Sequence, residues 1–567
     1  MAVYQRPPTE ITTIKRTGRR LVPLLIVFMC VCELFYLQIF ALSPLPGLHL
    51  SDSPLTIAWS WTLAPFHLLL TSITPFFGTL LVEHTWFSSL LLGSAFIGLA
   101  VAYTGAIVAV VHLKHATSRR LLFLLLGGAL LFGLTLLFQP KLFSDDVFTY
   151  IFSGRILTVY GADPLNTAPL QYPADPYFSW VLSGRNAPNI YGPLWLCVAA
   201  LLAKISNVPF ITLLIFKGFA LLTHLVNCVL IWAILGKIAP TRRVLGTLLY
   251  AWNPLAVIEL AGGGHNEGFL ILLLLLVTWL YIQYVDTGGL WFFTGMLTVF
   301  GLAVSTNLLA LLLAPLYMWF DMRTELSITH AIWSFCLRVL AILIPEVLIS
   351  LPFWRGASTF FSLTSAVDIQ HFVHSPVGTL SIPIRALFQF VADVEHFPPL
   401  LQPITAADVT LRASALFIFV LIYANLFNRL RYAPGSVAPI HRRSRKPILD
   451  TEMRLPGFDV LFASCGIAVF WYLILVSGWF WPWYVLWLLW TVMLRRLDAF
   501  TSAILILSGT ALFLYPFVGF TRGPIATYQA ALIFGIPLVY LVIASFRQRL
   551  VERTAVSYER RSGTTQD

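Results

Sequence analysis

The chain has 567 residues, of which 58% are hydrophobic and only 11% are charged, and its mean hydropathy is +0.82. This balance excludes a water-soluble domain, because many apolar runs reach the roughly 20 residues needed to cross the hydrocarbon core of a bilayer. The net charge of +11 does not indicate a nucleic-acid partner, because Lys and Arg gather between apolar runs, as in the cytosolic loops of membrane proteins.

Long unbroken apolar runs, such as FLILLLLLVTWLYI at 269–282, predict helices, since the strands of a membrane barrel would alternate apolar and polar residues. The predicted fold class is therefore an all-α polytopic membrane protein. The six cysteines are scattered through apolar segments, and neither a CxxC pair nor a Cys/His cluster occurs. This pattern indicates neither a disulfide framework nor a zinc site.

Segment 1–20 is basic and precedes an apolar run at 21–43, which is long for a signal peptide. We interpret the run as a retained first span that follows a cytosolic tail. Threading the chain through the later basic clusters predicts further spans. They lie near 87–113, 120–138, 208–236, 244–260, 267–285, 290–320 (two short passes), 330–352, 411–430, 458–477, 482–494, 499–517 and 525–545.

This threading makes 21–545 a single transmembrane domain with both termini in the cytosol. The basic loop 431–457 and the tail 546–567 also lie in the cytosol. The apolar stretches 57–81 and 192–206 do not fit as full spans and are expected to lie at or dip into the outer face. Four polar segments then fall together outside the cytosol: 139–191, 261–267, 353–410 and 479–484.

The first of these segments opens with Asp145 and Asp146, directly after an apolar run. A carboxylate at a membrane surface is costly enough that it usually has a partner or a task. One carboxylate could face a substrate while the other holds the loop. The alternative is that the pair only caps a helix that starts at this point, and both interpretations can hold together. Some fifty residues rich in Pro and Tyr follow, including Tyr191, and suggest a functional loop.

The second segment lies in WNPLAVIELAGGGHNEGFL, where three glycines allow a tight turn that presents His265, Asn266 and Glu267. A single histidine here could be an ordinary interface residue, but three hydrogen-bonding side chains in a row favour substrate binding. No metal-ligand spacing is present.

The other two segments supply cations and aromatic rings. In 353–410, Arg355, His371, His374 and Arg385 could hold a phosphate, although each could also be an ordinary loop charge. Arg155 of the first segment is a further cation on the same side. Trp483 and Tyr484 belong to SGWFWPWYVLW, whose rings could stack on a sugar; by composition alone this segment is an aromatic belt.

In order across roughly residues 120–490, the motifs FSDDVFTYIFSGRI, YGADPLN, YGPLW, NPLAVIELAGGGHNEG and PWYVLWLL resemble bacterial integral-membrane mannosyltransferases that use polyprenyl-phosphate mannose. These belong to the GT-C superfamily of glycosyltransferases. The acidic pair is shared across that superfamily, whereas YGPLW with GHNE is similar to the mannan-elongating α-(1→6)-mannosyltransferase branch.

The resemblance implies a GT-C-type bundle of about 13–14 transmembrane helices with large extracytoplasmic loops, in a bacterial plasma membrane. An Asp of the first outer loop, Asp145 or Asp146 with a slight preference for Asp145, would deprotonate an acceptor hydroxyl. That hydroxyl would attack the anomeric carbon with inversion. The implied partners are a polyprenyl-phosphate sugar donor, a glycan or glycolipid acceptor, and membrane lipid.

The resemblance also leads us to expect a lysine in a K-x-x-A context, where this chain has Asn307. Arg355 is the predicted substitute near the donor phosphate. No cofactor is expected. An acidic pair could bind a divalent ion, but without a third clear ligand we expect metal independence.

Three other interpretations remain open. A transporter or lipid flippase would also have many helices, but it would place polar residues in broken helices at the bilayer midplane. A non-catalytic envelope assembly protein would not require the acidic pair. The third is a GT-C enzyme that uses a different polyprenyl-phosphate sugar. The sequence discriminates poorly between such sugars, since epimers differ only in the direction of one hydroxyl.

Overall fold

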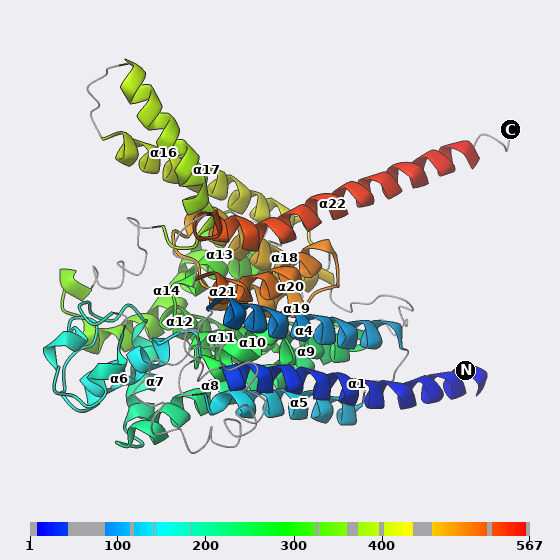
Figure 1. Cartoon of the computed structure of the whole chain (residues 1–567). Helices are drawn as coiled ribbons and strands as arrows, with labels where there is room; N and C mark the ends of the chain where they lie inside the picture. The colour runs from blue at the N-terminus through cyan, green and yellow to red at the C-terminus, as the bar shows by residue number, and fades with distance from the viewer. Residues whose placement is uncertain are drawn as a thin grey trace.

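The chain folds into a bundle of α-helices (Figure 1), seen here in a computed structural model. Within the described residues the only β-pairing is a single bridge between Val373 and Trp479. The predicted all-α class is therefore confirmed. The structure describes residues 8–42, 85–113, 118–139, 142–182, 184–323, 328–359, 372–395, 402–434, 456–518 and 524–562. The predicted stretch 57–81 lies outside these residues.

In this part of the chain, eleven helical segments are long and apolar enough to cross a membrane, or twelve if a pair of helices bent by 51° counts as one span. The protein is therefore a multi-pass membrane protein. The helices that carry the eleven spans are α1 (Pro8–Leu42), α4 (Thr85–His112), α5 (Arg119–Leu137), α8 (Pro209–Ile238), α11 (Glu267–Thr287), α14 (Ile328–Ser350), α16 (Pro376–Glu395), α17 (Pro403–Arg431), α18 (Pro456–Trp471), α20 (Ala499–Leu512) and α22 (Pro524–Ser562).

Shorter elements connect these helices. They are α6 (Asp146–Thr158), η1 (Pro169–Gln171), η2 (Phe178–Trp180), α7 (Pro193–Ala203), η3 (Pro240–Arg242), α9 (Arg243–Ala251), α10 (Pro254–Val257), η4 (Ile258–Gly262), α12 (Leu290–Val304), α13 (Leu309–Met322), η5 (Leu351–Phe353), η6 (Tyr472–Val476), η7 (Pro482–Val485), α19 (Leu486–Met493) and α21 (Leu514–Val518).

The predicted spans agree with these elements in two places and differ in others, among them the predicted span 482–494, which holds only η7 and the eight-residue α19. The 290–320 stretch consists of two short helices, α12 and α13, and the stretch 192–206 contains only the 11-residue α7. Helix α16 was not predicted, because the sequence analysis assigned all of 353–410 to a loop. Its mean hydropathy is 1.3, the lowest among the eleven spans, since Arg385 and Asp393 interrupt its apolar residues.

The helices run between two ends of the bundle. Figure 1 shows α6 and α7 at one end, which we call the site end, and the N-terminus of α1 and the C-terminus of α22 pointing the other way. At the site end, Gln139 after α5 donates to the Phe40 carbonyl at 3.0 Å. At the opposite end, Lys237 of α8 pairs with Asp286 of α11 at 2.7 Å.

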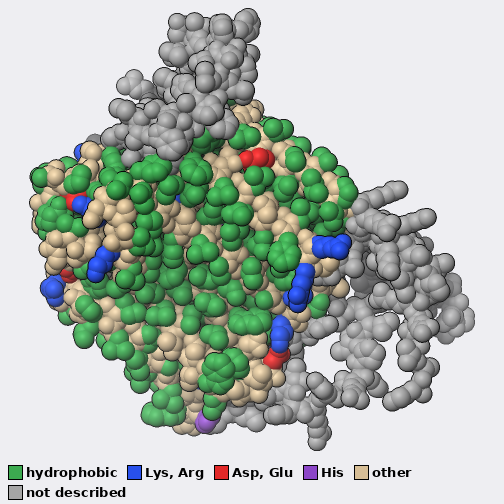
Figure 2. Space-filling model, turned by 90° about the horizontal axis from the view of Figure 1, so that it is seen from below, with side chains coloured by type: hydrophobic (Ala, Val, Ile, Leu, Met, Phe, Trp, Pro, Cys, Tyr) green, Lys and Arg blue, Asp and Glu red, His purple; other side chains and the backbone are tan. Residues whose placement is uncertain are grey.

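The flank of the bundle is apolar. Figure 2 shows a broad hydrophobic face on which Lys and Arg side chains lie mainly toward the margins. Val101, Phe123 and Leu340 are each more than half exposed. Apolar exposure on this scale is not stable in water, so this flank is the surface that faces lipid.

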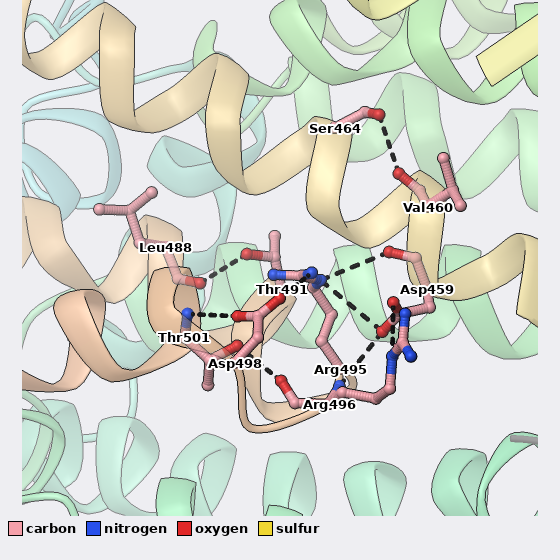
Figure 3. Close-up of polar contacts among 9 residues, drawn as sticks. All are labelled: Asp459, Val460, Ser464, Leu488, Thr491, Arg495, Arg496, Asp498 and Thr501. Carbon is pink, nitrogen blue, oxygen red and sulfur yellow. Dashed lines mark hydrogen bonds and ion pairs between the residues drawn. The ribbon is translucent and has the colours of Figure 1, made fainter. Parts of the chain in front are cut away.

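An ion-pair cluster ties three helices together at the opposite end (Figure 3). Asp459 of α18 lies 3.3 Å from Arg496 Nε, and Arg495 Nη2 pairs with Asp498 at 2.7 Å. The Asp498 side chain also caps α20 by accepting the Thr501 N–H at 2.8 Å. This cluster fixes the turn between α19 and α20 against the start of α18.

Candidate active site

The connection from α5 to α6 presents the acidic pair at the site end. Phe143 adopts φ +58°, a left-handed conformation that is rare for residues other than glycine, and it turns the chain into α6. Asp145 is the N-cap position, and its Oδ2 accepts the N–H of Leu182 at 3.2 Å from the far side of the loop. Asp146 is the first helical residue, and its N–H donates to Ser144 Oγ at 3.2 Å. The two carboxylates therefore have different surroundings.

Asp146 faces the histidine of the second predicted segment. Its Oδ2 lies 3.7 Å from His265 Nδ1, and its side chain is 21% exposed while that of His265 is fully buried. Burial, reinforced by the charge of Asp145, raises the pKa of the Asp146 carboxyl, although His265, Tyr191 and Ser144 oppose the shift. Two segments about 120 residues apart in the sequence thus meet in one cluster.

A π-turn and three glycines explain why the chain can place His265 there. The π-helix η4 ends at Gly262, and π-turns often occur at functional sites. A Cβ at Gly263 would lie 2.6 Å from His265 Cδ2, so only glycine fits beside the imidazole. Gly264 adopts φ +72° and passes close to Val147 of α6. The GGGH run can therefore pass close to helix α6.

His265 lies among three carboxylates. Glu259 Oε2 is 3.3 Å from its Nε2, and Glu267 Oε2 is 3.8 Å from its Nδ1, the nitrogen that also faces Asp146. Burial alone would lower the pKa of His265, but the contact with Glu259 and the charges of Glu267 and Asp146 outweigh burial and raise the pKa to about 8. At neutral pH the imidazole is therefore a buried cation between acids.

Tyrosines line one side of this cluster. The Tyr150 ring contacts the Tyr191 ring edge-to-face at 4.8 Å, and the Tyr150 hydroxyl donates to Asn266 Oδ1 at 3.5 Å. The Tyr191 hydroxyl hydrogen-bonds to Asp146. Both Asn266 and Tyr191 therefore belong to the predicted site, although Asn266 is almost fully buried.

Aromatic rings form a column on another side of His265. Trp483 stacks on the imidazole at 4.2 Å, Trp481 stacks on Trp483 at 5.2 Å, and His374 meets Trp481 edge-on at 4.9 Å. The bridge at Val373 holds the 372–375 segment against 478–480. Tyr484 stacks on Trp487, and its burial raises its pKa, with smaller contributions from the charges of Glu267 and Asp146. Trp483, Tyr484 and His374 thus belong to one group of rings beside His265.

The predicted arginines have other partners. Arg155 forms a buried two-point pair with Asp175, with Nη2 to Oδ2 at 2.8 Å. Arg385 pairs with Asp408, with Nε to Oδ1 at 2.7 Å. Arg355 is exposed, and its guanidinium donates to the carbonyl of Trp354. His371 lies outside the described residues.

Asn307, which replaces the expected lysine, lies in the break between α12 and α13. Its Oδ1 accepts the N–H of Leu309 at 2.9 Å and caps the start of α13. The break packs on the YGPLW segment, where Leu194 N–H donates to Ser305 O at 3.0 Å. The position is therefore at the site end, but it carries no cation.

Sequence reasoning missed Glu259, Tyr515 and Lys217. Tyr515 donates to Glu259 Oε1 at 2.6 Å. Lys217 of α8 is fully buried and donates to the carbonyls of Leu136 and Gln139 at the end of α5. A lone charge within each of the predicted spans 208–236 and 244–260 was the available signal, because such charges are rare in membrane helices without a function.

Among the described residues, no group of three or more His, Cys, Asp or Glu side chains has the arrangement to hold a metal ion. Neither a curated protein nor a solved structure matches the chain. Residues 81–323, which contain α6, the acidic pair and the GGGHNE turn, match the family described as "Alpha-(1->6)-mannopyranosyltransferase, N-terminal domain". Over residues 81–323 the chain is similar to that family, which confirms the resemblance found in the sequence, and the chain is a membrane glycosyltransferase of the mannosyltransferase class.

Proposed function

We propose that the enzyme transfers mannose from a polyprenyl-phosphate donor to a hydroxyl of a glycan or glycolipid acceptor, at the extracytoplasmic face of a bacterial plasma membrane. The observation that carries this proposal is the partly exposed Asp146 carboxylate, which lies 3.7 Å from the buried His265 at the site end. A general base needs an accessible oxygen beside groups that control its charge, and Asp146 meets both conditions.

In the proposed step, Asp146 accepts the proton of the acceptor hydroxyl as its oxygen attacks the anomeric carbon. The new C–O bond forms while the bond between that carbon and the phosphate oxygen breaks, with inversion. Polyprenyl phosphate leaves with the bonding electron pair. Asp145, whose carboxylate accepts the Leu182 N–H, holds the loop. We therefore assign the base to Asp146, although the sequence slightly favoured Asp145.

A leaving phosphate needs hydrogen-bond donors or cations. Arg155 is engaged by Asp175, so it is a poor choice for this role. We keep Arg355 as the candidate because its guanidinium is exposed at the site end, where Thr359 also hydrogen-bonds Asn166 at 3.2 Å. The apolar flank gives the prenyl tail a lipid-facing surface to follow.

The first test measures transfer of labelled mannose from polyprenyl-phosphate mannose to a short α-mannoside, in membranes that contain each variant. We expect Asp146→Asn to lose about 10²–10⁴-fold in rate, the usual contribution of a general base. Asp145→Asn should lose less, because it weakens a contact that holds the loop and leaves the base in place. Asp286→Asn, at the opposite end, is the matched control and should retain wild-type transfer.

The outcomes separate the open interpretations. Transfer of a different lipid-linked sugar, with the same loss in Asp146→Asn, would keep the mechanism and change the donor. A larger loss in Asp145→Asn would move the base to Asp145. If inserted, folded protein uses no lipid-linked sugar at all, the proposed reaction is wrong and the transporter interpretation gains.

A further inference from the structure

The mechanism proposed above does not use Glu259, a carboxylate that is almost completely buried in the π-turn η4. Its Oε2 lies 3.3 Å from His265 Nε2, and its Oε1 accepts the Tyr515 hydroxyl at 2.6 Å. Burying a carboxylate is costly unless both oxygens have partners, and here each has one. The two contacts fix the direction from which Glu259 faces the imidazole.

Tyr515 connects this carboxylate to the acidic pair. Its ring stacks on Phe143 at a centroid distance of 4.1 Å and an interplanar angle of 11°. Phe143 is the residue with φ +58°, three positions before Asp146. A closed circuit of contacts therefore runs from Asp146 to His265, Glu259, Tyr515 and Phe143, and back along the chain to Asp146.

The two ring nitrogens of His265 face different partners. Nε2 faces Glu259, which has no access to an acceptor, whereas Nδ1 faces Asp146 and Glu267. The charged groups around the imidazole are these three acids, from η4, α6 and α11, while Trp483 stacks on the ring. On the α8 side, the Lys217 side chain packs beneath Gly264, and its ammonium is bound to the carbonyls of Leu136 and Gln139.

We propose that Glu259 and Tyr515 are positioning residues, which keep His265 protonated and keep its Nδ1 side toward the Asp146 base. The role assigned to Asp146 rests on the proposed function. Without the imidazolium, Asp146 and Glu267 would be two acids near the same ring nitrogen with no cation between them, and the Asp146 base would ionise less readily.

The pH dependence follows from this arrangement. Because the pKa of Asp146 is raised, transfer should increase as the pH rises through that value and the base ionises. Because the pKa of His265 is about 8, transfer should fall as the pH rises through 8 and the imidazolium is lost. The profile of kcat/KM should therefore be bell-shaped.

The direct test follows the titration of His265 by NMR in nanodiscs that contain histidine-labelled enzyme, with His265→Asn used to assign the signal. In Glu259→Gln we expect the proton affinity of His265 to fall by about 10-fold or more, the effect of losing an opposite charge at this distance. Tyr515→Phe should lower it by a smaller factor, because Glu259 then loses its second partner. Glu346→Gln, a carboxylate of α14 that hydrogen-bonds Ser350, is the matched control and should not change the titration.

The second readout is the pH profile of mannose transfer. Glu259→Gln should transfer nearly as well as wild type at pH 6, lose about 3-fold at pH 7.5 and approach a 10-fold loss at pH 8.5, because the lower His265 proton affinity moves the falling limb toward acid. Equal losses at all pH values, with an unchanged His265 titration, would overturn the positioning role.

The two proposals can fail separately. If wild-type enzyme transfers no mannose, the proposed function fails, while the NMR titration still decides whether Glu259 and Tyr515 hold His265 protonated. If mannose transfer depends on Asp146 but the His265 titration is the same in both variants, the proposed function stands and the positioning role is wrong.

Discussion

Single residues decide how closely the GGGHNE turn can approach α6. At Gly264 the chain adopts φ +72°, and a Cβ built there would lie 3.0 Å from Val147 Cγ2 and 3.2 Å from Lys217 Cγ. A side chain at this position meets both backbone strain and crowding. The turn that carries His265 past Asp146 therefore depends on this glycine.

We expect Gly264→Ala to destabilise the protein by about 1–2 kcal/mol from the left-handed backbone alone, with more from the contact with Val147. Transfer should fall as well, because the shift moves His265 relative to Asp146. Thermal unfolding in detergent and the transfer assay check these two effects. Gly127→Ala is the control, since nothing lies within 4 Å of its added Cβ. Wild-type stability in Gly264→Ala would contradict the crowding argument.

At the scale of elements, a buried ion pair fastens the first large loop to α6. Arg155 of α6 meets Asp175 between η1 and η2, and the two side chains are 8% and 0% exposed. Tyr160 also donates to Asp175 at 2.8 Å, and Arg155 lies over the Tyr177 ring at 4.1 Å. These contacts occupy the arginine that the sequence suggested for phosphate binding.

We expect Asp175→Ala and Arg155→Ala each to cost about 3–5 kcal/mol, because either change leaves one buried charge without its partner. Both should lower the midpoint of thermal unfolding to a similar extent, and the double variant should recover part of the loss. Lys237→Ala, which breaks an exposed pair, is the control and should change stability little.

A different result would restore the predicted role of Arg155. If Arg155→Ala raised KM for the lipid-linked donor while Asp175→Ala did not, the guanidinium would contact the donor phosphate. The comparison distinguishes the two roles because only a structural pair makes the two residues interchangeable in effect.

At the scale of the whole molecule, the bundle has two chemically different ends. The acidic pair, the GGGHNE turn and the aromatic column lie at the site end. The N-terminus of α1 and the C-terminus of α22 point toward the opposite end (Figure 1). The cluster of Asp459, Arg495, Arg496 and Asp498 joins the start of α18 to the turn between α19 and α20 (Figure 3). From the distribution of basic residues in the sequence, we expect the opposite end to face the cytosol.

This assignment predicts the labelling of single cysteines introduced into a cysteine-free background. The first variant is Gln171→Cys, since Gln171 is exposed in the first loop, and the second is Arg431→Cys, since Arg431 is exposed at the end of α17. In intact cells a membrane-impermeant maleimide should react with the first and reach the second only after permeabilisation. The opposite pattern would place the active site in the cytosol. Detergent-solubilised protein, in which both should react, controls for intrinsic reactivity.

The sequence by itself determined the membrane class, most helices and the chemical nature of the site. Apolar runs long enough to cross a bilayer have few alternatives to a helix, because no water is present to satisfy an unpaired backbone. The motifs with Asp146, His265 and Trp483 were likewise visible as polar or aromatic residues at the ends of such runs. Local composition is sufficient for these features, since each depends on a short segment.

Only the tertiary structure decided which of these residues meet. It showed that Asp145 and Asp146 have different partners and that Arg155 is paired with Asp175. It also placed Glu259 beside His265 and Tyr515 beside Glu259. Glu259 and Tyr515 are 256 positions apart in the chain, so no local pattern could pair them. Such contacts follow from how helices pack and where a π-turn points a side chain, and these depend on the entire bundle.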